Sequence, residues 1–182
     1  MPPTTDNPDE IFDLIDNADH VIGHVRRGDA HRNPALLHRS VQVLVFDDAG
    51  RILLQRRSAT KDLFPGYYCA SASGHVISGD DYAETARREI EEELGVSLDV
   101  RFIEKVVVAS AFETEMTALF VARSNGPFDF NTDETAGGAF FERADLRASE
   151  PRLALTPAAE SALAAIERLA ESGTLAQCLA GL

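Results

Sequence analysis

The sequence contains no tryptophan and only two cysteines, Cys69 and Cys178. These are too few and too far apart for a disulfide framework or a four-ligand zinc site, so a reducing cytoplasm is the simplest expected location. Nowhere do about eighteen apolar residues follow one another, the length that a membrane helix needs. The start at Met1 also lacks a basic segment followed by an apolar one. We therefore expect neither a membrane span nor an export signal.

Basic residues are also scarce relative to acidic ones. The 17 Lys and Arg stand against 30 Asp and Glu, which gives a net charge of −13. Because nucleic-acid backbones are held by clustered Lys and Arg, no nucleic acid polymer is expected as a partner. An acidic chain remains compatible with small phosphate ligands, since carboxylates can hold divalent cations that in turn face phosphate.

The length and the local patterns indicate one domain. A chain of 182 residues with 45% hydrophobic residues can bury a substantial core. We expect a flexible N-terminal tail at residues 1–9, a domain over residues 10–172 and a C-terminal tail at residues 173–182. Alternation and turn residues predict strands at residues 11–15, 21–25, 41–46, 51–55, 68–73, 102–109, 114–122 and 138–141. A first helix is predicted over residues 81–94, with Asp81 as the start signal and Gly95 as the stop signal. A second is predicted from Thr156 to about residue 169.

The first predicted helix carries three neighbouring carboxylates. Small and apolar residues line one face of this helix. Glu89, Glu92 and Glu93 follow at positions i, i+3 and i+4, so their side chains lie together beside that face. Like charges at this spacing destabilise a helix by roughly a few tenths of a kcal/mol per pair unless a cation compensates them. A site for Mg²⁺ or Mn²⁺, which take oxygen ligands, is one interpretation, and a solvated acidic helix face is the other.

The longer segment around this helix, residues 74–96, decides between the two. It resembles the Nudix box, whose pattern is Gly, five residues, Glu, seven residues, and Arg-Glu-aliphatic-any-Glu-Glu-any-Gly-aliphatic. The matching positions are Gly74, Asp80, Arg88, Glu89, Ile90, Glu92, Glu93, Gly95 and Val96. Asp80 departs from the pattern, because Glu is usual there. A long motif with several fixed positions is far more specific than a short glycine pattern.

This resemblance implies a fold, a metal site and a reaction. The fold is α/β, the Nudix fold, an α/β/α sandwich around a mixed β-sheet. Glu89, Glu92 and Glu93, with the main-chain carbonyl of Gly74, would bind Mg²⁺ (or Mn²⁺), and Arg88 would orient these acids. Metal ions neutralise a diphosphate and make a bound water more acidic, and a carboxylate then acts as base. Glu92 or Glu93 is the first choice for this base, and Glu134 is the alternative, with a solvated turn as its other interpretation.

A second resemblance concerns the branch of the family that includes the type 1 isopentenyl-diphosphate isomerases and their hydrolase relatives. That branch places a metal between histidines and acids, and the corresponding positions here are His31, His38, His75, Glu113 and Glu115. Taken singly, these are ordinary hydrogen-bonding histidines or exposed strand residues; together they indicate a possible second metal site.

The same branch also suggests how a substrate is held. Arg57 and Lys61 match the positions that contact the substrate diphosphate in that branch. The alternative interpretation is that both are ordinary surface charges that keep the protein soluble. Phe64, Tyr67 and Tyr68 could stack on a base, although aromatic residues at strand edges more often pack in the core.

Two departures argue against isomerase chemistry. The isomerases need a cysteine directly before the box glycine for proton transfer at carbon, whereas this chain has Ser73, and Cys69 lies four residues too early. The second half of the box, which isomerases tend to lose, is intact. We therefore predict a Mg²⁺-dependent Nudix hydrolase that cleaves the diphosphate linkage of a small nucleoside di- or triphosphate derivative or a related organic diphosphate.

Two other functions remain open as alternatives. One is an isopentenyl-diphosphate isomerase-like enzyme, and the other is a non-catalytic Nudix-like ligand-sensing domain. The second is disfavoured because no box acid has been lost. The expected partner is a small-molecule diphosphate, and a homodimer is compatible with the family resemblance.

Overall fold

The computed structural model describes residues 7–147 and 153–182, so most of the tail predicted at residues 1–9 lies outside the described residues. Within these ranges, nine strands belong to one sheet: β1 Ile11–Ile15, β2 Val21–Arg26, β3 Leu37–Phe46, β4 Ile52–Arg57, β5 Tyr68–Cys69, β6 Ala72–His75, β7 Arg101–Ala109, β8 Thr114–Arg123 and β9 Thr135–Phe141. The helices there are α1 Arg27–Ala30, α2 Tyr82–Leu94, α3 Arg143–Arg147, α4 Pro157–Glu171 and α5 Thr174–Leu179.

Strand β3 lies at the centre of the sheet and pairs with β1, β4, β6 and β8. Its pairing with β8 is parallel, while its pairings with β1, β4 and β6 are antiparallel, so the sheet is mixed. The single strand expected at residues 68–73 is divided in two. Its first part, β5, pairs with β4, and its second part, β6, pairs with β3, because the chain passes from one neighbour to the next between them.

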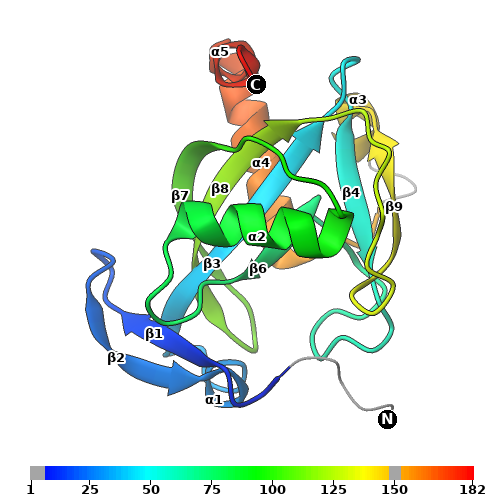
Figure 1. The fold of residues 1–182 in the computed structure, drawn as a ribbon. Coiled ribbons are helices and arrows are strands. Elements are labelled where there is room, and N and C mark those ends of the chain that lie inside the picture. The colour runs from blue at the N-terminus through cyan, green and yellow to red at the C-terminus, as the bar shows by residue number, and fades with distance from the viewer. Residues whose placement is uncertain (1–6, 148–152) are drawn as a thin grey trace.

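Alternating residues of β3 separate two hydrophobic layers. Val41, Val43 and Val45 pack toward α2, whereas Leu44 and Phe46 pack toward α4 on the opposite face. Figure 1 shows α2 lying across one face of the sheet and α4 behind the other. The predicted α/β/α sandwich around a mixed sheet is confirmed.

Local signals set the ends of both long helices. The Asp81 carboxylate accepts a hydrogen bond of 2.8 Å from the Glu84 backbone N–H, and Gly95 ends α2 at a φ of +67°. A left-handed residue at this position favours glycine, which has no β-carbon to clash. The Thr156 hydroxyl accepts a hydrogen bond from the Ala159 backbone N–H at 3.2 Å, directly before Pro157. The predicted start of α4 is therefore observed, and the helix continues to Glu171.

The segment assigned to a C-terminal tail, residues 173–182, contains helix α5. Its Leu175 is buried against the α4 side of the sheet. The Arg101 guanidinium, far away in sequence, donates hydrogen bonds to the backbone carbonyls of Gln177, Cys178 and Ala180. The hydrophobic core thus extends past residue 172. The contacts that hold α5 join residues far apart in sequence, so a local pattern does not reveal them.

Among the described helices, none combines the length and the apolar character that a membrane crossing requires. Cytoplasmic location and dimer formation stay predictions.

Candidate active site

A cavity of about 330 Å³ lies where α2 and β6 meet the loops that follow β4 and β7. It is lined by the sequence-predicted site residues Arg57, Lys61, Gly74, His31, His75, Arg88, Glu89, Glu92, Glu93, Glu113, Glu115 and Glu134. Of the predicted set, His38 alone is absent from this lining; it lies fully buried behind it. The fold therefore gathers residues that are spread over more than half of the chain.

The three box carboxylates differ in exposure. Glu89 and Glu93 are buried, with 9% and 8% of their surface exposed, whereas the Glu92 side chain points largely into solvent. Arg88 contacts two of them, with its Nη1 at 3.0 Å from Glu89 Oε1 and 3.5 Å from Glu92 Oε2. Asp80 is more distant from Arg88, at 3.8 Å, in keeping with its shorter side chain.

Gly74 is required by a close approach of the helix to β6. A β-carbon added at Gly74 would lie only 2.5 Å from Oε2 of Glu89. Glycine therefore leaves the space that the Glu89 carboxylate occupies next to the main chain. This arrangement places a backbone segment and a carboxylate side by side, as the sequence resemblance implies for a metal site.

Burial of the two carboxylates favours their protonated forms. For Glu89, burial and the nearby Glu92 charge raise the pKa to about 7 against the opposing effect of Arg88. For Glu93, burial and the adjacent Glu89 charge raise the pKa well above its usual value. In the protein alone, these two acids are therefore poorly compensated by positive charge.

Gln55 is a site residue that sequence analysis missed. Its Nε2 donates a hydrogen bond of 2.6 Å to Glu93 Oε2 and another to the Ser71 carbonyl. Gln55 is itself 1% exposed, so this amide fixes one oxygen of Glu93 from behind. A glutamine in an apolar strand is a weak signal for such a role, because the contact depends on how β4 faces α2.

Arg57, Lys61 and Glu134 line the same cavity. Lys61 forms an ion pair with Glu134, and its side chain is mostly buried. The Arg57 Nε donates to the Leu63 carbonyl at 3.1 Å, which ties the loop between β4 and β5 to the end of β4. The structure thus joins a predicted substrate-binding cation to the alternative candidate base, a pairing that sequence analysis did not anticipate.

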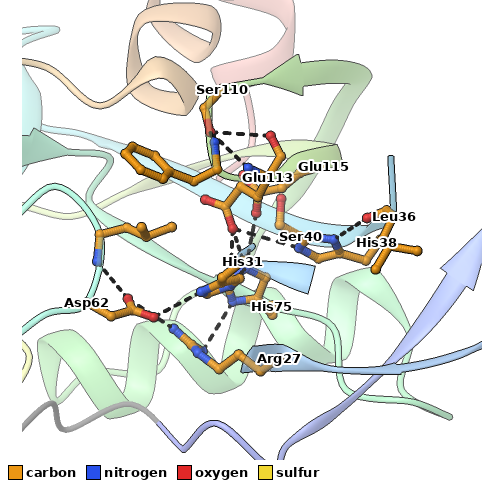
Figure 2. A network of polar contacts seen from close by, with 12 residues as sticks. Arg27, His31, Leu36, His38, Ser40, Asp62, His75, Ser110, Glu113 and Glu115 are labelled. Atoms are coloured by element: carbon orange, nitrogen blue, oxygen red, sulfur yellow. Dashed lines mark hydrogen bonds and ion pairs between the residues drawn. The ribbon is translucent and has the colours of Figure 1, made fainter. Parts of the chain in front are cut away.

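Beside the box carboxylates lies a second group of ligand-type side chains, shown in Figure 2. One ligand atom each from His31, His38, His75 and Glu113 can be chosen so that all lie within 4.8 Å of one another. Glu115 joins them through its Oε1, 3.3 Å from His75 Nε2. The structure brings all five sequence-predicted residues together.

Neighbours hold this histidine cluster in position. The Leu36 carbonyl accepts a hydrogen bond of 3.0 Å from His38 Nδ1. His31 Nδ1 lies 2.9 Å from Asp62, and Arg27 Nη1 lies 3.3 Å from His75 Nδ1. Asp62 and Arg27 were not identified from the sequence. With their δ nitrogens engaged, the histidines direct their ε nitrogens toward Glu113.

Charge in this cluster is unevenly shared. Burial opposes a charged His75, but contacts with Glu113 and Glu115 outweigh it and raise the His75 pKa to about 9. Burial likewise opposes a charged Glu115, yet His75 lowers the Glu115 pKa to about 2. Burial lowers the pKa of His38, whose Nε2 has no hydrogen-bond partner among the described residues. A neutral, buried imidazole nitrogen without a partner is the form that binds a metal ion.

Comparison with known proteins decides the family. The family model described as the NUDIX domain matches residues 36–165 of the 182. The chain belongs to the Nudix family. The predicted membership is thereby confirmed, as is the general enzyme class, a Nudix-type hydrolase of diphosphate bonds.

Relatives of this Nudix protein include hydrolases and an isomerase. An uncharacterised Nudix hydrolase of Streptomyces coelicolor is 39% identical over 141 residues, which are 76% of this chain and 77% of that protein. An isopentenyl-diphosphate Delta-isomerase of Nocardia farcinica is 41% identical over 85 residues, 47% of this chain and 49% of the isomerase. The crystal structure of DR0079 from Deinococcus radiodurans superposes with a TM-score of 0.72 at 28% identity, covering 84% of this chain and 97% of that one.

Replacing Glu89 by Gln is expected to stabilise the metal-free Nudix protein at alkaline pH. The Glu89 pKa rises from 4.5 to about 7 on folding. Folding therefore takes up a proton between these values, and stability is lost as the pH rises through this window. In EDTA at pH 8, Glu89→Gln should raise the free energy of unfolding by about 3 kcal/mol, and the difference should vanish near pH 4.

Urea denaturation at several pH values measures this difference. Glu91→Gln, on the exposed face of the same helix, is the matched control and should leave the stability unchanged. A Glu89→Gln protein that is less stable than the wild type at pH 8 in EDTA would contradict the assignment.

Proposed function

We propose that this protein is a divalent-metal-dependent hydrolase of the diphosphate linkage in a small nucleoside di- or triphosphate derivative or a related organic diphosphate. The observation that carries the proposal is the burial of Glu89 and Glu93 side by side next to Gly74, in the cavity that also contains Arg57 and Lys61. A solvated acidic helix face, the alternative interpretation of these acids, would leave them exposed.

The residues at this position suit Mg²⁺ or Mn²⁺. Both ions take carboxylate and carbonyl oxygens, and Glu89, Glu93 and the Gly74 carbonyl are oxygen donors on adjoining elements. The raised pKa values of Glu89 and Glu93 show that the chain's own cations leave these acids undercompensated. A divalent ion held by these residues would supply positive charge next to the diphosphate and would make the attacking water more acidic.

The chain's own residues would position the carboxylates and accept the proton of the attacking water. Arg88 holds the Glu89 and Glu92 carboxylates in register along α2. Gln55 donates to one oxygen of Glu93, a residue that lines the cavity, and the other oxygen is the first candidate to accept a proton. Glu134 remains the alternative base; its ion pair with Lys61 has to open before it can take that role.

Arg57 and Lys61 are proposed to hold the diphosphate. Both line the same cavity as the α2 carboxylates, and the Lys61 side chain is mostly shielded from solvent. Partial burial strengthens a charge-assisted hydrogen bond because water competes less for the donor. A phosphate oxygen can replace the Glu134 carboxylate as the partner of Lys61, so substrate binding and release of the alternative base are coupled.

A second metal ion is proposed in the histidine cluster. Its support is the convergence of three imidazoles on Glu113 and the buried His38 Nε2, which lacks a hydrogen-bond partner among the described residues. Imidazole and carboxylate ligands suit Mn²⁺ and other first-row transition ions better than Mg²⁺.

The assembled cluster is also what favours an isomerase as the second candidate function. Proton exchange at carbon needs an ionisable group in the cavity at the position of Ser73. Ser73 lacks the acidity for this, and Cys69, which also lines the cavity, is a poor substitute because burial raises its pKa to about 12. Hydrolysis, which uses the intact carboxylates, therefore remains the leading proposal.

Hydrolysis is tested with a panel of nucleoside di- and triphosphate derivatives in Mg²⁺, followed by release of phosphate or nucleoside monophosphate. Glu93→Gln should lower kcat by about two orders of magnitude or more, because it removes both a metal ligand and the candidate base. Its circular dichroism should be unchanged, and Glu91→Gln should keep wild-type activity. Interconversion of isopentenyl and dimethylallyl diphosphate without hydrolysis of any panel member would overturn the proposal in favour of the isomerase.

The second ion is tested by metal analysis of protein dialysed after incubation with Mn²⁺. Wild-type protein should retain about one more ion per chain than His31→Gln, because His31 contributes a ligand nitrogen. His20→Gln replaces an exposed histidine of the β1–β2 hairpin and should retain the wild-type amount. Equal retention by His31→Gln and the wild type would remove the second metal from the account.

A further inference from the structure

Gln42, on the central strand β3, is a buried polar residue whose side chain lacks a partner. It is 5% exposed, and its Oε1 has no hydrogen-bond partner among the described residues. Buried amide groups are nearly always hydrogen-bonded, because leaving water without gaining a partner costs free energy. Gln42 also lines the cavity. We therefore looked for the missing partner in a molecule that occupies the cavity.

The register of the sheet places Gln42 between the histidine cluster and the core. Four alternate residues of β3 share one face of the sheet, namely His38, Ser40, Gln42 and Leu44. His38 belongs to the histidine cluster, whereas Leu44 packs in the core toward α4. Ser73 of β6, directly opposite Gln42, lines the cavity as well. Gln42 thus lies where the polar wall of the cavity passes into apolar packing.

The hydroxyl groups in this part of the wall already have partners. The Ser40 hydroxyl, labelled in Figure 2, lies 2.9 Å from the Thr117 hydroxyl. The Thr156 hydroxyl, at the start of α4, accepts a hydrogen bond from the Ala159 backbone N–H. These groups are engaged with one another or with the backbone, so they do not supply the partner of Gln42.

Packing alone does not explain a glutamine at this position. The next residue inward on the same face, Leu44, is apolar, and so is Leu119, which lies opposite Gln42 on β8. An apolar side chain of similar size would fill the same volume without burying an unpaired amide. A local rule that is broken at the wall of a cavity, at a cost in stability, indicates a residue that serves a ligand.

A hydroxyl group is the ligand group that suits this amide best. An amide offers an acceptor oxygen and an NH₂ donor, and a hydroxyl can both donate and accept, so it can pair with either end. A hydrocarbon group would cover the amide without pairing it. Lys61 and the buried carboxylates line the same cavity of about 330 Å³, so a group attached to a diphosphate held there shares this space with Gln42.

We propose that Gln42 determines the specificity of the site by hydrogen bonding to a hydroxyl on the organic group of the diphosphate substrate. This inference rests on the proposed function and adds the chemical class of the organic group, which is hydroxylated, as in a sugar or an alcohol, instead of a plain hydrocarbon chain. Gln42 acts on that group and does not touch the reacting atoms.

Thermal unfolding of ligand-free protein in EDTA tests the unpaired amide. Gln42→Met keeps the length of the side chain and removes the amide, so it should raise the midpoint of unfolding by about 2–6 °C. Gln42→Leu, a second apolar replacement, should also raise it. Gln177→Met makes the same change at an exposed position of α5 and should leave the midpoint unchanged. A structural role of the amide, such as holding a buried water, predicts a lower midpoint in both Gln42 variants, and that result overturns the proposal.

Calorimetry in Mn²⁺ tests the hydroxyl with non-hydrolysable probes that differ only in that group. One pair is adenosine α,β-methylene diphosphate and its 2′,3′-dideoxy counterpart. The other is a set of methylenediphosphonate esters with hydroxyalkyl chains of different length and the matching alkyl esters. Wild-type protein should bind the hydroxylated probe about tenfold more tightly in one of these sets, which distinguishes a sugar from a simple alcohol. Gln42→Met should lose this preference and still bind unesterified methylenediphosphonate as the wild type does.

Two binding results would overturn the role of Gln42. One is the absence of any hydroxyl preference in both sets of probes, and the other is a preference that Gln42→Met retains. Either result leaves the hydrolase proposal standing when phosphate release still depends on Glu93. A hydroxyl preference that depends on Gln42, in a protein that hydrolyses no diphosphate, would instead refute the hydrolase proposal and keep Gln42 as a recognition residue.

Discussion

The burial of two carboxylates side by side on α2 is the constraint on which the rest of the site depends. Glu89 and Glu93 lie one helical turn apart and face the cavity, while their neighbours Ile90 and Leu94 are fully buried in the adjoining core. Because those apolar side chains fix the rotation of α2, the acids cannot turn toward solvent to relieve their repulsion. The free energy of packing therefore maintains an electrostatic arrangement that is unfavourable by itself and that a cation makes favourable.

The register of the sheet extends this arrangement to residues far apart in the chain. Strand β3 places His38 opposite Glu115 of β8 and opposite Leu14 of β1, and Ser40 opposite His75 of β6. Gly74 lies one residue before His75, so the carboxylate site on α2 and the histidine cluster share the strand β6. A shift of register by one residue would turn these side chains to the other face of the sheet. The carboxylate site and the histidine cluster would then both be lost.

The parts that the sequence predicted and those it missed differ in the range of the interactions that create them. Asp81 and Gly95 delimit α2 through contacts within a few residues, so the helix and its three carboxylates were predictable from local patterns. Gln55 and Asp62 were not, because each acts on a side chain that only the tertiary fold brings near. The docking of α5 through Arg101 has the same cause. Lys61 and Glu134 were identified singly, and their pairing emerged only from the folded loops.

Calorimetric titration of metal-free protein with Mg²⁺ and Mn²⁺ at pH 8 tests the central claim most directly. The account predicts saturable Mg²⁺ uptake that is lost when Glu89 and Glu93 are both replaced by Gln in a protein that keeps its fold, whereas Mn²⁺ uptake falls by about one ion per chain and persists at the histidine cluster. A well-folded wild-type protein that takes up neither ion, even in the presence of a pyrophosphate compound, would contradict it.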